Sequence, residues 1–459
     1  MTEGNGLQNL VEDVLILILT HCDVLSVVAI GATSKYFHHL ALTRNVWLAF
    51  VTQLVQRRFI DRRPDDENLR DLSTEQLVDK VKIIFRGPKT WSPETHPHPI
   101  ESRRIVLHPD IPPGISFWKN EPKLLPGGKY VLFQNQGTLE CWNVFEDELI
   151  WQHACSMNHA TVLSFAAELT EDDQLIILTC QHTWNYPRKN FFEFTTLDLR
   201  TVFPSLILVG RFADSPLNDA PYTCCALCGD IAAVELNGQV TLVNWRTSSC
   251  VVILTRSPRY HSHIALATNC LVLTLLGPHG EPQLACSPLP SPASWAPIDS
   301  VREPSSSIPV EALPITFGDT ISVNGRTFTH RVSRSFLSVH ESPINPGRFR
   351  VWLHIANHEM GALCSYEFVF RESEVSWRRR SSVLVNPKIR FFNPAGVAFS
   401  GHVLGSPTVV FPPVPLLDEL TAPRVSLTLE NRGDFTHLSP YSGAVTYATN
   451  KSLAVVYYN

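Results

Sequence analysis

The chain carries little charge and lacks any apolar run long enough to cross a membrane. Charged residues make up 18% of its 459 residues, and the net charge of −5 gives no basic field that would attract a nucleic acid. Its most apolar run, residues 14–19, follows Glu12 and Asp13 where a signal peptide would carry basic residues. His21 and Asp23 end this run. We therefore expect no signal peptide, no membrane partner and no nucleic-acid partner.

Motifs of catalysis and metal binding are missing as well. The sequence contains no nucleophile elbow, no Gly-rich phosphate loop and no metalloprotease helix. Cys224, Cys225 and Cys228 have a Cys-x-x-Cys spacing but no second pair of ligands, which favours thiols packed in a strand. The pairs at residues 96/98 and 261/263 (His-x-His) are typical of solvated loops. We expect no enzyme activity, no cofactor and no metal.

The cysteines indicate a reducing environment. Their number is 11, which is odd, and several lie inside apolar runs, as Cys180 and Cys270 do. Buried free thiols behave as small hydrophobic side chains, and proteins with many of them are typical of reducing compartments. The expected location is the cytoplasm, the nucleus or both.

The N-terminal part of the chain has the pattern of several helices. Residues 1–9 are polar and are predicted to be disordered. Residues 10–50 predict three short helices and the start of a fourth, with Asp23 as the N-cap of the second and residues 33–34 opening the third. Residues 51–87 predict a helical extension with a capping box at Ser73 and Gln76 and a stop at Gly87. The Pro-rich residues 88–103 predict a stiff linker, or a strap against the next domain.

From Arg104 onward the apolar period becomes two. The clearest unit is a meander with strands at 129–134, at 138–144 and from 149 onward. Residues 231–253 predict a second unit with a hairpin turn at Asn237 and Gly238. In that unit, we interpret Trp245 as taking the place of Trp142.

Such repeats are typical of a β-propeller, and residues 104–459 give room for about seven irregular blades of roughly 45–50 residues each. A pair of β-sandwiches is the competing architecture. We interpret the last strand pattern, residues 444–459, as closing a ring with residues 104–107. The predicted fold class is therefore α+β and multidomain: a three-helix head with a helical extension, then an all-β domain.

The head resembles an F-box. The resemblance rests on Leu10, Val11, Asp13, Val14, Leu15, Ile18 and Leu19, on the Asp-led segment 23–28, on Phe37 and on Trp47. Val11 departs from the family pattern, which usually has Pro there. Together with residues 126–144 (PGGKYVLFQNQGTLECWNV), the chain resembles a fungal type of F-box protein with a WD-like C-terminal domain.

This resemblance implies a substrate-recognition subunit of a cullin-RING ubiquitin ligase. The head would dock a Skp-type adaptor and, through it, a cullin, while the β domain would hold an unknown protein target. A head of roughly 40–50 residues cannot bury all of its apolar side chains, so a partner, or the β domain itself, should cover the surplus. The predicted adaptor-binding residues are Leu10, Val11, Val14, Leu15, Ile18, Leu19, Val24, Leu25 and Val28.

A basic cluster in the β domain is the candidate for target binding. Trp377, Arg378, Arg379 and Arg380 offer guanidinium groups that suit a phosphorylated or acidic segment. The alternative is a solvated loop or hairpin tip. Two other functions also stay open: a propeller enzyme or carbohydrate-binding module with a helical cap, and a scaffold that acts outside a ligase.

Overall fold

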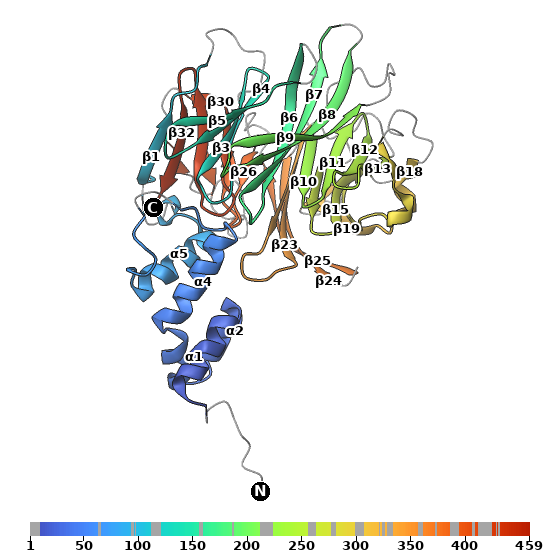
Figure 1. Ribbon diagram of the computed structural model, residues 1–459. Coiled ribbons are helices and arrows are strands. Elements are labelled where there is room, and N and C mark those ends of the chain that lie inside the picture. The colour runs from blue at the N-terminus through green and yellow to red at the C-terminus, as the bar shows by residue number, and fades with distance from the viewer. Residues whose placement is uncertain are drawn as a thin grey trace.

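The computed structural model of the protein has an N-terminal helical region and a β-propeller (Figure 1). The structure describes residues 10–459 except for 63–65, 93–95, 97, 112–120, 156–158, 186–187, 212–223, 256–262, 277–280, 299–306, 321, 324–325, 328–333, 357–360, 372–373, 386–393, 406–408, 412–424, 428 and 430–431.

Local sequence signals start the helices where we expected them. The Asp23 carboxylate accepts a hydrogen bond from the backbone N–H of Ser26 at 2.9 Å, and the Ser34 hydroxyl caps the third helix. Ser73 and Gln76 form the predicted capping box. No helix in the described part of the chain is long and apolar enough to span a membrane. The helices are α1 (Glu12–His21), α2 (Val24–Gly31), α3 (Lys35–Ala41), α4 (Arg44–Gln56) and α5 (Thr74–Arg86).

One hydrophobic core runs through the whole helical region. Trp47 of α4 is one of its buried members, and the indole N–H of this residue donates a hydrogen bond to the Ala41 carbonyl at 2.9 Å. Because the core also contains Phe399 of the propeller, head, extension and propeller pack continuously. Its other buried members are Leu15, Leu19, Val27, Leu40, Ala41, Val46, Phe50, Val51, Leu54, Phe59, Leu72, Leu77, Val81 and Ile84.

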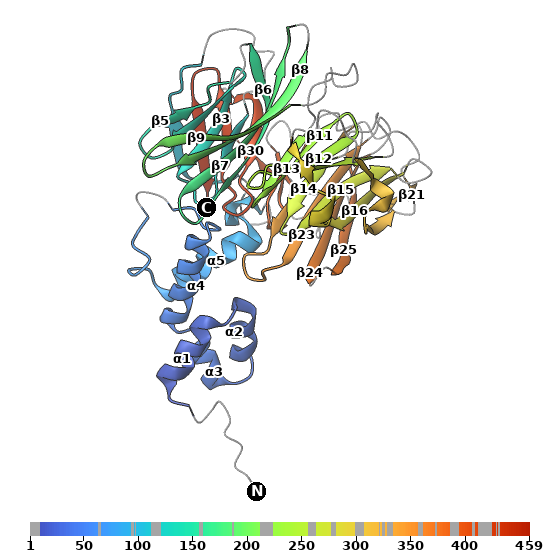
Figure 2. The same cartoon turned by 45° about the vertical axis from the view of Figure 1, so that its right-hand side comes forward.

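The β domain is a propeller of seven blades, each built on four antiparallel strands. The first strand of each blade lies innermost, and these inner strands contact one another around the ring. The blades form seven separate sheets, several of which can be told apart in Figure 2, and not two stacked sheets, so the sandwich alternative is wrong. Short additional strands pair at the rim of the third blade.

The strands follow the chain blade by blade. The first three complete blades are β2 (Pro122–Leu124), β3 (Tyr130–Asn135), β4 (Thr138–Asn143), β5 (Glu148–Gln152); β6 (Ala160–Leu169), β7 (Gln174–Thr183), β8 (Lys189–Asp198), β9 (Phe203–Arg211); and β10 (Cys224–Cys228), β11 (Ile231–Leu236), β12 (Gln239–Asn244), β13 (Ser249–Leu254) with β17 (Ala296–Pro297) and β18 (Ser307–Pro309).

The remaining blades complete the ring, and β20 (Ser322–Val323) and β21 (Arg326–Thr327) form a separate hairpin. These blades are β14 (Ile264–Ala267), β15 (Cys270–Leu276), β16 (Pro282–Pro288), β19 (Thr316–Thr320); β22 (Arg334–Glu341), β23 (Arg348–Ala356), β24 (Gly361–Arg371), β25 (Glu374–Val385); β26 (Pro394–Val397), β27 (Val403–Gly405), β28 (Val409–Phe411), β29 (Val425–Ser426); and β30 (Arg432–Leu438), β31 (Val445–Thr449), β32 (Leu453–Tyr458) with β1 (Glu101–Leu107).

The ring closes by pairing the two ends of the domain, as the sequence pattern predicted. β1 runs antiparallel to β32, with Arg104 opposite Val456 and Leu107 opposite Leu453. β1 therefore supplies the outer strand of a blade whose other three strands come from the last part of the chain. The strand begins at Glu101, three residues before the domain boundary expected at Arg104.

The two predicted meanders are present, but one equivalence between them is wrong. Asn237 and Gly238 have the positive φ angles of 51° and 75° that a tight hairpin turn requires. The Trp245 backbone N–H donates to Asp230, as that of Val144 donates to Lys129. Trp245 therefore corresponds to Val144, which follows its strand, whereas Trp142 lies within β4. In both hairpins a strand of six residues, a two-residue turn (136–137 or 237–238) and a second strand of six residues follow one another, so aligning the turns gives this equivalence.

Candidate functional site

The outer surface of the head is unusually apolar. Helices α1 and α2 lie at the end of the molecule away from the propeller (Figure 1), and no described segment of the propeller covers them. Exposed apolar patches of this kind mark contacts with a partner. We call this set the head surface; its exposed side chains are Leu10, Val11, Val14, Leu17, Ile18, Leu25 and Val28.

Three of the predicted adaptor-binding residues do not belong to this surface. Leu15 and Leu19 are each 3% exposed and pack in the helical core, so their assignment as contact residues is wrong. Val24 is only partly exposed and packs against the same core. Helical periodicity groups the apolar positions, but α1 is apolar on nearly every side, so spacing alone did not show which side faces inward. For the same reason the sequence interpretation missed Leu17, which is 59% exposed.

Among the described residues, the β domain does not cover the surplus apolar side chains of the head, contrary to that alternative. The propeller instead packs on the other end of the helical region. Phe85 of α5 lies 5.5 Å from Phe399, and Phe59 lies 4.7 Å from Tyr441, both measured between ring centroids. These contacts fix the extension to the propeller and leave the head surface open.

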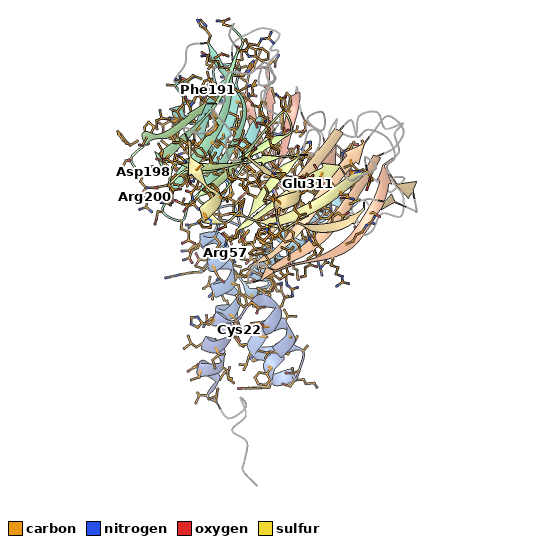
Figure 3. All side chains as sticks on the ribbon, turned by 90° about the vertical axis from the view of Figure 1, so that its right-hand side faces the viewer. Cys22, Arg57, Phe191, Asp198, Arg200 and Glu311 are labelled. Atoms are coloured by element: carbon orange, nitrogen blue, oxygen red, sulfur yellow. The ribbon has the colours of Figure 1, made fainter. Side chains whose placement is uncertain are left out.

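Two arginines after α4 tie the same junction together by charge. Arg57 lies between the helices and the propeller (Figure 3) and is 3.8 Å from the Glu341 carboxylate. Its guanidinium also donates to the Pro343 carbonyl at 3.0 Å. Arg58 reaches Asp173 in the turn between β6 and β7 at 2.9 Å. The hydrogen-bond partners of Arg57 and Arg58 are 115 or more residues away in sequence.

The predicted target-binding cluster lies on β25, the outer strand of its blade, and not at a loop or hairpin tip. Trp377 packs on Phe368 with ring centroids 5.2 Å apart and belongs to the hydrophobic core of the blade. Arg378 and Arg380 alternate with it and are exposed. The Arg380 Nε donates to the Glu367 carboxylate at 2.8 Å, which neutralises part of the positive charge. The tryptophan is therefore structural, and Arg378 is the most available of the three arginines.

The Cys-x-x-Cys motif lies in a strand, as the alternative to a metal site predicted. One His-x-His pair lies before the first strand, and the other is only partly described. Cys224, Cys225 and Cys228 lie on β10, and burial raises the pKa of the Cys228 thiol to about 12. His96 and His98 belong to the segment before β1, while residue 261 is not among the described ones. Within the described part of the chain, no group of three or more His, Cys, Asp or Glu side chains is placed to hold a metal ion.

No protein-family model matches the chain, and no curated protein matches it. Among solved structures, it is similar to the dihydro-heme d1 dehydrogenase NirN in complex with DHE, with 12% identity and a TM-score of 0.40 over 89% of this chain and 92% of that one. It is also similar to the WD40 domain of SCAP from fission yeast, with 11% identity and a TM-score of 0.24 over 74% of this chain and 84% of that one.

A third similar structure is the extracellular domain of a one-component system from B. thetaiotaomicron. The identity is 8% and the TM-score 0.37, over 77% of this chain and 40% of that chain. The protein thus spans less than half of the length of that bacterial chain. Similarities at this level carry no functional conclusion, and the propeller is established by the pairing of its own strands.

Proposed function

We propose that this protein is the substrate-recognition subunit of a cullin-RING ubiquitin ligase. In this proposal, the head surface binds a Skp-type adaptor, and the propeller binds the protein to be modified. The observation that supports it best is the head surface itself: seven exposed apolar residues, two just before α1 and five on α1 and α2, in a region that projects from the propeller. The F-box-like order of residues in α1, α2 and α3 points to this adaptor as the occupant.

The arrangement suits a receptor that performs no bond chemistry. The adaptor would hold the head at one end, while the propeller lies at the other end of a continuous core. Because that core leaves little freedom between the two parts, a bound target would be held at a fixed place relative to the ubiquitin-loaded enzyme. Such positioning raises the effective concentration of the reacting groups.

Matched substitutions in the full-length chain test the proposal. Ile18 on the head and Ile207 on β9 of the propeller are both 39% exposed. We expect Ile18→Lys to weaken binding to purified Skp-type adaptor at least tenfold, because a charge would be buried in the contact. Ile207→Lys should bind as the wild type does. A lysine near the C-terminal end of α1 is compatible with the helix dipole, so the helix should persist.

Binding is measured by surface plasmon resonance, and the melting temperature of each variant reports its fold. If the wild-type chain does not bind the adaptor, or if Ile18→Lys binds it as tightly as Ile207→Lys does, the proposal is wrong. An exchange at Leu15 would not serve this purpose, because that side chain is part of the helical core.

A further inference from the structure

Two free cysteines meet at the boundary between the second and the third blade. Cys180 lies on β7, and Cys225 lies on β10, the inner strand of the next blade. Cys180 is a buried member of a hydrophobic cluster, and Cys225 packs against the same cluster. The two thiols form a hydrogen bond with each other. A disulfide between them would therefore link two neighbouring blades covalently.

The pairing of strands holds both thiols in place beside Ser164 of β6. Ser164 is opposite Cys180 in the ladder between β6 and β7, and its hydroxyl oxygen lies 3.3 Å from the Cys225 Sγ. Opposite residues of an antiparallel pair point to the same face of a sheet, with Cβ atoms roughly 4.5–5.5 Å apart. Cys180 and Ser164 thus both point from the second blade toward the third, where Cys225 lies.

The two thiols differ in acidity and exposure. Hydrogen bonds from the thiol of Cys180 and the hydroxyl of Ser164, together with the positive charge of Lys123, lower the pKa of Cys225 against the opposing effects of burial and Glu121. Burial raises the pKa of Cys180. Cys225 is half-buried, whereas Cys180 is completely buried. A thiol that oxidises readily combines thiolate character, access and a second thiol beside it, and Cys225 has all three.

We propose that Cys225 is a site of oxidation by hydrogen peroxide and that Cys180 then closes a disulfide between the second and the third blade. In the first step, the Cys225 thiolate attacks one peroxide oxygen and the O–O bond breaks. Cys225 becomes a sulfenic acid, and the second oxygen leaves as hydroxide, which takes up the proton released by the thiol.

In the second step, the Cys180 sulfur attacks the sulfur of this sulfenic acid and the S–O bond breaks. The leaving hydroxide takes the proton of Cys180 and departs as water. In sum, two thiols are oxidised to one disulfide while one peroxide is reduced to two waters. The site does not depend on whether the head binds an adaptor.

Peptide mapping by mass spectrometry tests the site in the full-length chain. The folded protein is treated with hydrogen peroxide, remaining thiols are alkylated, and disulfide-linked peptides are quantified over time. Cys270 and Cys286 serve as a matched control pair in the same chain: their thiols also form a hydrogen bond, but both side chains are completely buried, and this bond and burial raise the pKa of Cys286. We expect the link between Cys180 and Cys225 to form at least roughly tenfold faster than a link between Cys270 and Cys286.

Two alanine variants separate the two steps. In Cys180→Ala, the sulfenic acid of Cys225 should persist and be trapped by dimedone, because the sulfur that attacks it is gone. In Cys225→Ala, Cys180 should stay reduced, because it is buried and protonated. Melting temperatures report the fold of each variant, and the two pairs of the wild type decide the matter if a variant unfolds.

Three results would overturn the inference. The first is that peroxide produces no link between Cys180 and Cys225 in the wild type. The second is that Cys270 and Cys286 become linked just as fast. The third is that dimedone labels Cys180 in folded Cys225→Ala as fast as it labels Cys225 in folded Cys180→Ala.

Discussion

Trp91 packs edge-on against His402, with ring centroids 5.4 Å apart and ring planes at 66°. Trp91 is completely buried, and its ring also lies 5.6 Å from that of Tyr458 in the last strand. The segment from Pro88 to Trp91 is thus a strap that holds the helical region against the propeller, and not a free linker. Trp91 thereby joins a hydrophobic cluster of the propeller, whereas Phe399 of the propeller joins the helical core.

Gly87, at the end of α5, is predicted to be intolerant of any side chain. Its φ of 74° disfavours L-residues, and a Cβ placed there would lie 2.6 Å from the His402 Nδ1. Gly87→Ala should therefore lower the free energy of unfolding by about 2–4 kcal/mol, from backbone strain plus displacement of a buried ring. Urea unfolding followed by tryptophan fluorescence measures this change.

Gly229→Ala separates the two contributions. Gly229 also has a positive φ, 56°, but no atom lies within 4 Å of the position of its Cβ. This variant should lose only the cost of backbone strain, about 1–2 kcal/mol. Equal losses at Gly87 and Gly229 would show that the contact with His402 is not tight.

Acid should destabilise the protein through His402. Burial lowers the pKa of His402 from 6.5 to about 4, because a charged imidazole is disfavoured beneath the strap. The unfolded chain then binds a proton more readily than the folded one, so this stability is fully present above pH 6.5 and is lost as pH falls toward 4. At pH 5 the loss from this residue should be about 2 kcal/mol.

The measurement compares urea unfolding at pH 7.5 and pH 5 in the wild type and in His402→Asn, which cannot titrate in this range. We expect the pH dependence to be smaller in the variant, although its stability at pH 7.5 is also lower because packing against Trp91 is lost. An unchanged pH dependence in the variant would mean that His402 is not the group responsible.

Neighbouring leucines of α1 should respond very differently to truncation. Leu15 is 3% exposed in the helical core, and Leu15→Ala should cost about 2–5 kcal/mol of stability. Leu17 is 59% exposed, and Leu17→Ala should change stability by no more than about 0.5 kcal/mol. Thermal unfolding of both variants checks the orientation of α1, which would be reversed if Leu17→Ala were the more damaging change.

The sequence predicts those features that depend on neighbouring residues. The caps at Asp23, Ser34 and Ser73 and the hairpin at Asn237 are each set by a few adjacent side chains, and all of them are present. The number of blades could also be predicted, because strand-and-turn repeats of similar length recur along the chain.

Features that depend on distant residues could not be predicted in the same way. The side of α1 that faces the core is chosen by contacts with α4, and the ion pair between Arg58 and Asp173 joins residues that are 115 positions apart in the numbering. The burial of Trp91 likewise depends on His402 and Tyr458. No local periodicity encodes such pairs.

Removal of β1 should destroy the propeller, because this strand closes the ring. A chain that starts at His108 lacks Glu101–Leu107, so β32 would expose a fully buried apolar strand with unpaired backbone groups. A chain that starts at Pro88 keeps β1 and the strap. We expect the longer chain to unfold cooperatively in urea and the shorter one to aggregate or to lose its cooperative transition. If the chain that starts at His108 unfolds with the same midpoint as the chain that starts at Pro88, pairing of β1 with β32 does not stabilise the ring.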